Sequence, residues 1–107
     1  MSSHDQLAAL LARLSYRDGD FTLASGAKST FYLDAKQVSY HPDGVELVGT
    51  AVHALACEFG AEAVGGPTLG ADAIVLAAVF ASYKTNRPLT GFIVRKSPYF
   101  VRVSFTL

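Results

Sequence analysis

The residues with the clearest chemical potential lie in the stretch 63–72, AVGGPTLGAD, where a short apolar segment enters a glycine-rich turn and then an apolar helix. Gly65, Gly66 and Gly70 allow positive φ and let a ligand approach the backbone without meeting a Cβ. A strand that enters a helix through such a turn directs free N–H groups and the positive end of the helix dipole toward one point. The stretch therefore suits phosphate or pyrophosphate. By spacing alone a tight turn without a ligand is the commoner case, and neither the GxGxxG nor the Walker pattern is present.

A second candidate is the cationic pair Arg95 and Lys96, which follows the apolar segment 89–94. That segment predicts a buried strand, and open α/β sheets bind ligands at the carboxyl ends of their strands. The planar fork of an arginine and the mobile charge of a lysine can neutralise a phosphate or a carboxylate. Because the glycine turn is expected at the same edge, the two stretches together favour an anion site. For either cation taken singly, a solvated strand end remains the alternative.

A third candidate is the loop 24–29, which contains Lys28, two serines and a glycine. The flanking segments 21–23 and 30–33 predict two short strands and hence a hairpin. The loop could bind an oxyanion by charge and hydrogen bonds, but a solvated hairpin tip would have the same composition. The residues alone leave both readings open.

Composition excludes several classes of function. Nine basic and nine acidic residues cancel, so there is no electrostatic footprint for nucleic acid or for an anionic membrane. The single cysteine, Cys57, cannot form an internal disulfide, which fits a reducing cytoplasm. No secretory signal precedes the first helix, and the apolar run 71–81 is too short to span a bilayer. These features predict a soluble cytoplasmic domain with its own core.

The periodicity predicts an α/β chain. Residues 17–20 predict a turn, residues 41–44 a helix entry with proline in the first turn, and Gly60 the end of that helix. The apolar segment 71–83 predicts a helix that covers one side of a sheet. Ser3 and Gln6 have the form of a capping box at the start of the first helix. The apolar positions of the two helices are Leu7, Leu10, Leu11 and Leu14 in the first, and a buried stripe of Val45, Val48, Val52, Leu55, Ala56 and Phe59 in the second.

The three histidines predict no metal site. His53 is expected to lack a partner histidine or cysteine at metal-ligand spacing, while His4 and His41 stand alone near helix starts. All three are interpreted as structural or solvent-facing.

Three stretches, in order, resemble the orotate phosphoribosyltransferases, a family of type I phosphoribosyltransferases. They are FTLASGAKSTFYLD at 21–34, VGGPTLGAD at 64–72 and FIVRK at 92–96. The resemblance implies the N-terminal half of the type I fold within one domain, with a hood of helix and β-hairpin at 1–40. A partial α/β core, a β-α-β unit of a parallel sheet, would follow at 41–96. A divergent tail would follow at 97–107.

The implied reaction transfers ribose 5-phosphate from phosphoribosyl pyrophosphate to orotate, with Mg²⁺ on the sugar and diphosphate oxygens, in pyrimidine biosynthesis. Catalysis would come from positioning and from stabilising the departing diphosphate. The resemblance places Lys28, Phe31 and Tyr32 in the hairpin that covers orotate. It places the pyrophosphate loop at Gly66, Pro67, Thr68 and Leu69, and assigns Arg95 and Lys96 to the diphosphate, often across a homodimer interface. Ala24 and Gly70 stand where some members have lysines.

The resemblance ends after Lys96. Family members continue with a mobile loop that carries a lysine and a histidine, and later with an acidic phosphoribosyl pyrophosphate motif. This chain instead reads SPYFVRVSFTL, which alternates like a strand and could equally be the product of a frameshift. The resemblance therefore implies a truncated transferase with little or no activity as this chain alone. One alternative is a non-catalytic relict, or a module for binding or dimerisation. The other is an unrelated anion-binding α/β domain, which leaves the three ordered matches unexplained.

Overall fold

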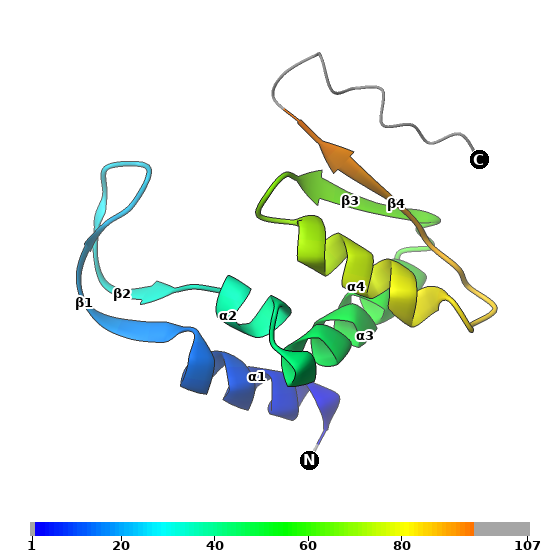
Figure 1. The fold of residues 1–107 in the computed structure, drawn as a ribbon, viewed down its shortest axis with the longest axis horizontal. Helices are drawn as coiled ribbons and strands as arrows, with labels where there is room; N and C mark the ends of the chain where they lie inside the picture. Colours follow the sequence, from blue (N-terminus) through cyan, green and yellow to red (C-terminus); the bar gives the residue numbers. More distant parts are fainter. Residues whose placement is uncertain (1, 96–107) are drawn as a thin grey trace. The chain divides into compact units, whose positions relative to one another are not determined.

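The computed structural model describes residues 2–95. They form two compact units, divided between Leu47 and Val48. The order of elements is that of an α/β chain in which a hairpin precedes a parallel pair of strands (Figure 1). The elements are α1 (Ser3–Leu14), β1 (Tyr16–Thr22), β2 (Lys28–Leu33), α2 (Lys36–Ser39), α3 (Pro42–Glu58), β3 (Ala63–Pro67), α4 (Asp72–Ser82) and β4 (Thr90–Val94).

The first helix, α1, begins with a capping box, one residue earlier than the sequence predicts. Ser2 is the N-cap; its Oγ accepts from the Asp5 N–H at 3.1 Å, and the Asp5 carboxylate accepts from the Ser2 N–H at 3.4 Å. Ser3 and Gln6 were therefore the wrong pair, because a short Asp side chain closes the box as well as a Gln does. Of the leucines on the predicted apolar face, only Leu10 is buried.

The hairpin is longer than predicted, because β1 runs through the residues 17–20 that were expected to form a turn. It pairs with β2 in antiparallel register from Tyr16 opposite Leu33 to Thr22 opposite Lys28. The register shifts between Asp18 and Phe21, where Gly19 has φ 152°. The turn-forming residues therefore make a bulge inside a strand, which a glycine in this region of φ permits.

The first turn of α3 starts at Pro42, as the sequence predicts. The Asp43 N–H donates to His41 Nδ1 at 3.1 Å, so His41 caps this helix, which is one of the two roles that the sequence predicts for it. The short helix α2 was not predicted. A Cβ on Gly44 would collide with the Val38 carbonyl, which shows how closely α2 and the start of α3 approach.

The end of α3 is a Schellman motif, as expected from Gly60. The Gly60 N–H donates to the Cys57 carbonyl and the Ala61 N–H to the Ala56 carbonyl, with φ 69° at Gly60. The predicted buried stripe is only partly correct, because Phe59 is 81% exposed and Leu55 is 52% exposed. Small residues make the buried contact of this helix: a Cβ on Gly49 would overlap the Ala77 carbonyl of α4.

In the second unit, β3 and β4 are parallel neighbours and α4 connects them, as the sequence predicts (Figure 1). Their register runs from Ala63 opposite Thr90 to Pro67 opposite Val94. A Cβ on Gly91 would touch Val75 and Val79, so α4 lies against one face of this pair. The core that results consists of Ala56, Ala78 and Leu89, with Val52, Ala61 and Val64 packed against it.

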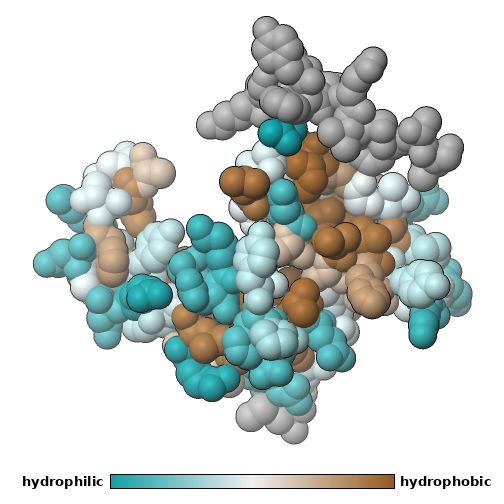
Figure 2. Space-filling view, in the orientation of Figure 1, coloured by the Kyte–Doolittle hydropathy of each residue, from teal (hydrophilic) through white to brown (hydrophobic). Residues whose placement is uncertain are grey.

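The outer side of α4 carries an apolar stripe that solvent reaches. Leu76, Phe80 and Tyr83 are spaced by one helical turn and are 69%, 71% and 72% exposed. Figure 2 shows hydrophobic residues gathered on the visible face of this unit. Within residues 2–95, no helix is long and apolar enough to cross a membrane.

A buried serine fixes the path from α4 into β4. The Ser82 hydroxyl donates to the Val79 carbonyl at 2.7 Å and accepts from the Leu89 N–H at 2.9 Å, and the residue is 1% exposed. We expect Ser82→Ala to lower the free energy of unfolding by about 1–3 kcal/mol, because it leaves the buried Leu89 N–H without an acceptor. Urea unfolding followed by circular dichroism measures this. The exposed Ser3→Ala is the control, and equal losses in both variants would contradict the account.

Candidate anion-binding edge

The glycine-rich loop and Arg95 lie at the same edge of the β3–β4 pair. Pro67 is the last residue of β3 and stands opposite Val94, the last residue of β4. The Thr68 N–H continues the pairing by donating to the Val94 carbonyl at 3.1 Å. The loop residues Gly66, Pro67, Thr68 and Leu69 and the strand-end residue Arg95 are therefore brought together, as the parallel arrangement predicts. Lys96, the other predicted cation, lies outside the described residues.

The loop presents backbone donors that the described chain leaves unused. The Ala71 N–H donates to the Pro67 carbonyl at 2.9 Å and the Asp72 N–H to the Leu69 carbonyl at 3.3 Å. The N–H groups of Leu69 and Gly70 have no acceptor within residues 2–95. They precede the first turn of α4, where the helix dipole is positive. Free amides at a helix start are the arrangement that binds phosphate groups. The Thr68–Leu69 peptide bond is cis.

The glycines of this loop allow positive φ, but none of them adopts it, and two of them serve close packing instead. The positive-φ glycines of the described chain are Gly19, Gly26 and Gly60. A Cβ on Gly66 would lie 2.6 Å from the Ala71 Cβ, and one on Gly65 would overlap the Phe92 ring. Gly70 is different, because a Cβ there would meet nothing within 4 Å. The missing Cβ at Gly66 therefore lets the loop pack against Ala71 at the start of α4, and the missing Cβ at Gly65 makes room for the Phe92 ring of β4.

Asp72 and Thr68 hold the loop from inside. The Thr68 hydroxyl donates to Asp72 Oδ2 at 3.2 Å, while Asp72 Oδ1 is buried without a hydrogen-bond partner. The hydroxyl proton of Thr68 is thus already used in this hydrogen bond. Within the loop, the hydrogen-bond donors left for an anion are therefore those of the backbone. Asp72, the carboxylate that follows the loop, has one oxygen engaged by Thr68 and the other buried, and no three His, Cys, Asp or Glu side chains gather within the described part of the chain. These residues do not fit a protein-held Mg²⁺ ion.

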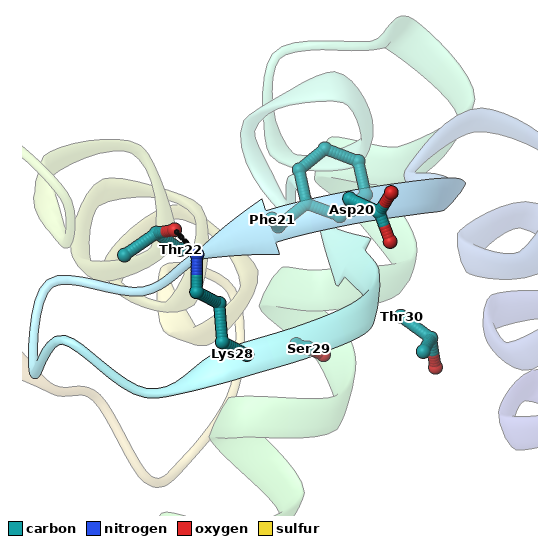
Figure 3. Close-up of a pocket in the computed structure, with 6 residues that line it drawn as sticks. All are labelled: Asp20, Phe21, Thr22, Lys28, Ser29 and Thr30. Carbon is teal, nitrogen blue, oxygen red and sulfur yellow. Dashed lines mark hydrogen bonds between the residues drawn. The ribbon is translucent and has the colours of Figure 1, made fainter.

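The hairpin of the first unit carries a shallow pocket of its own (Figure 3). Lys28 lies at its rim and its Nζ donates to Thr22 Oγ1 at 3.3 Å. Phe31 and Tyr32 of β2 contact different rings of β1, Phe31 that of Tyr16 and Tyr32 that of Phe21. The pocket is lined by Asp20, Phe21, Thr22, Lys28, Ser29 and Thr30.

Comparison with known proteins shows which family this chain is similar to. No protein-family model matches the chain. A curated orotate phosphoribosyltransferase of Aquifex aeolicus is 41% identical over 101 residues, which cover 92% of this chain and 55% of the relative. This chain is homologous to the orotate phosphoribosyltransferases. It spans about half the length of the curated relatives it matches.

Solved structures support the homology at the level of the fold. A phosphoribosyltransferase of Corynebacterium diphtheriae matches with a TM-score of 0.73 and 30% identity over 91% of this chain and 52% of its own. An orotate phosphoribosyltransferase of Mycobacterium tuberculosis, solved with 5-phospho-α-D-ribosyl 1-diphosphate, matches with a TM-score of 0.69 and 34% identity over 89% of this chain and 54% of its own. The predicted fold, an N-terminal helix and hairpin followed by a parallel β-α-β unit, is thereby confirmed.

Tyr16 is a hairpin residue of this homologue that the sequence analysis missed. Its ring stacks on Phe31 with centroids 5.9 Å apart, and Phe21 contacts Tyr32 at 5.7 Å. The Tyr16 hydroxyl donates to Asp18 Oδ1 at 2.7 Å, and this hydrogen bond raises the pKa of Tyr16. Both predicted aromatic residues are thus supported by an aromatic ring of β1 and remain 44–47% exposed.

The expectation that His53 lacks a partner is wrong. Cys57 Sγ lies 3.4 Å from His53 Nε2, because the two residues are one turn apart on α3. The sequence contained this signal in the four-residue spacing of His53 and Cys57.

Proposed function

We propose that this chain is the N-terminal, substrate-binding part of an orotate phosphoribosyltransferase. That enzyme would transfer ribose 5-phosphate from phosphoribosyl pyrophosphate to orotate and release pyrophosphate. The observation that carries the proposal is the shared edge at which the Gly66–Leu69 loop and Arg95 meet. This edge occurs in a chain similar to a mycobacterial enzyme solved with phosphoribosyl pyrophosphate.

The loop edge is proposed to bind the diphosphate. The N–H groups of Leu69 and Gly70 and the start of α4 supply fixed partial positive charge, and Arg95 supplies a full charge with a planar fork. Lys96 would add a second cation. The attraction between these groups and the diphosphate grows as the diphosphate departs and its negative charge increases. They would therefore lower the activation barrier of the transfer without a protein nucleophile.

The hairpin is proposed to cover orotate. The hairpin offers a cation, Lys28, and the aromatic rings of Phe31 and Tyr32 to a flat anionic base. Mg²⁺ would enter with phosphoribosyl pyrophosphate on its own oxygens, since the side chains at the loop edge do not fit a Mg²⁺ ion held by the protein. A homodimer and a cytoplasmic location belong to the same proposal.

The proposal predicts separable binding. In calorimetric titrations of the full chain, we expect pyrophosphate and orotate each to bind. Lys28→Ala should weaken the binding of orotate and leave the binding of pyrophosphate unchanged, because Lys28 belongs to the hairpin and not to the loop. The acidic motif implied by the resemblance is missing from these 107 residues, so orotidine monophosphate formation by the chain alone should stay at background. Absence of binding for both ligands would overturn the proposal.

A further inference from the structure

A nitrogen, a sulfur and an oxygen atom that each carry lone pairs lie close together beside the C-terminal half of α3. His53 Nε2 lies 3.4 Å from Cys57 Sγ and 3.0 Å from the Arg87 carbonyl oxygen. Neither side chain is fully exposed or fully buried. Arg87 precedes β4, whereas Arg95 follows it, so this cluster lies at the opposite end of the strand from the candidate anion edge.

The hydrogen bonding defines what could occupy the cluster. A carbonyl oxygen only accepts, so His53 Nε2 carries the proton that it shares with the Arg87 oxygen. Cys57 Sγ lies within reach of the same N–H. A cation that replaced this proton would find lone pairs of nitrogen, sulfur and oxygen.

The spacing of the two side chains suits a metal ion. Zn–S bonds of about 2.3 Å and Zn–N bonds of about 2.0–2.1 Å at a tetrahedral angle separate the two ligand atoms by about 3.6 Å. The measured separation of 3.4 Å is close to this value. Imidazole together with thiolate selects Zn²⁺ and similar thiophilic ions over Mg²⁺ or Ca²⁺.

The segment that carries the oxygen is fixed. The Arg87 N–H donates to Thr85 Oγ1 at 3.1 Å, and the Thr85 hydroxyl donates to the Ser82 carbonyl at 2.8 Å. Arg87 Nη2 reaches the Cys57 carbonyl at 3.5 Å and ties the segment to α3. The guanidinium charge opposes a dication, so the ion would be held reversibly.

We propose that His53, Cys57 and the Arg87 carbonyl form a binding site for a thiophilic cation such as Zn²⁺, with water completing the coordination. The site does not depend on the proposed transferase function. On taking up the ion, the neutral His53 imidazole would change tautomer, so that the Nε2 proton moves to Nδ1 and Nε2 is free to bind, while a neutral Cys57 thiol would release its proton to water.

The test uses Cd²⁺ as the spectroscopic probe and Zn²⁺ as its competitor on the full, metal-free chain, with a phosphine as reductant. We expect one Cd²⁺ per chain and a thiolate-to-metal absorption band that Zn²⁺ abolishes. Cys57→Ser should lose the band. His53→Gln keeps the Cys57 thiol but should bind Cd²⁺ at least about ten-fold more weakly than the wild type. His4→Gln, which removes an exposed histidine of α1, is the matched control.

A second readout protects the test from misfolded variants. Zn²⁺ should raise the melting temperature of the wild type and of His4→Gln, and should leave that of His53→Gln unchanged. If Cys57→Ser fails to fold, His53→Gln decides alone. The proposal is overturned if the wild type binds no Cd²⁺, or if His53→Gln binds it as tightly as the wild type.

Discussion

Replacing Gly49 by alanine is expected to lower the free energy of unfolding by about 2 kcal/mol. Alanine is favoured over glycine inside a helix by about 1 kcal/mol, so helix propensity alone would make this change stabilising. The added Cβ, however, would overlap the carbonyl oxygen and carbon of Ala77 in α4. These are backbone atoms, and only a shift of one helix against the other relieves the overlap, at a cost of about 3 kcal/mol. The steric cost therefore wins.

Urea unfolding followed by circular dichroism measures the difference, with the slope checked for two-state behaviour. Gly70→Ala is the matched control, because a Cβ there would meet nothing within 4 Å and its φ is not positive. We expect that variant to stay within about 0.5 kcal/mol of the wild type. An unchanged stability of Gly49→Ala would mean that α3 and α4 do not touch through Gly49 and Ala77.

Replacing Arg95 by alanine is expected to weaken pyrophosphate binding by about 10- to 100-fold, or about 1.4–2.7 kcal/mol. Arg95 would contribute the one full positive charge among the described residues of the proposed diphosphate edge, while the Leu69 and Gly70 amides contribute partial charges. Arg95→Lys should fall between the wild type and alanine, since it keeps the charge and loses the planar fork. Isothermal titration calorimetry at two salt concentrations measures the affinities.

Lys84→Ala is the control for Arg95→Ala, because it removes the same charge from an exposed residue beyond the C-terminal end of α4. It should leave the affinity for pyrophosphate nearly unchanged. If the wild type binds pyrophosphate and Arg95→Ala binds it equally well, Arg95 has no role in the site. If the wild type does not bind it, the proposed diphosphate edge itself is wrong.

The sequence predicted the elements whose signals are local. Pro42 and Gly60 bracket α3 because both act through their own backbone geometry. The apolar runs of β3 and β4, separated by a helix, predict parallel strands, and therefore predict that the glycine loop and Arg95 share an edge. Homology to a family was likewise readable from three ordered stretches.

The features that were missed depend on contacts distant in sequence or on the choice between two local patterns. Polar residues at 17–20 indicate a turn, yet pairing with β2 draws them into a strand with a bulge. Leu55 and Phe59 look buried by periodicity, but α3 makes its contact through Gly49. Binding roles remain predictions for Lys28, Phe31, Tyr32 and Arg95, because the sequence and the fold position these side chains but show no ligand beside them.

The two strand pairs differ in the length of chain that must be ordered before they can form. The β1–β2 pair closes across the short segment between Thr22 and Lys28, whereas β3 and β4 pair only after all of α4 has been traversed. Hairpins form in about 1–10 μs, while non-local parallel pairing must first meet the entropy of closing a longer loop. The edge that brings Arg95 to the glycine loop is therefore a late product of folding. A nascent chain can present its hairpin before it has any place for an anion.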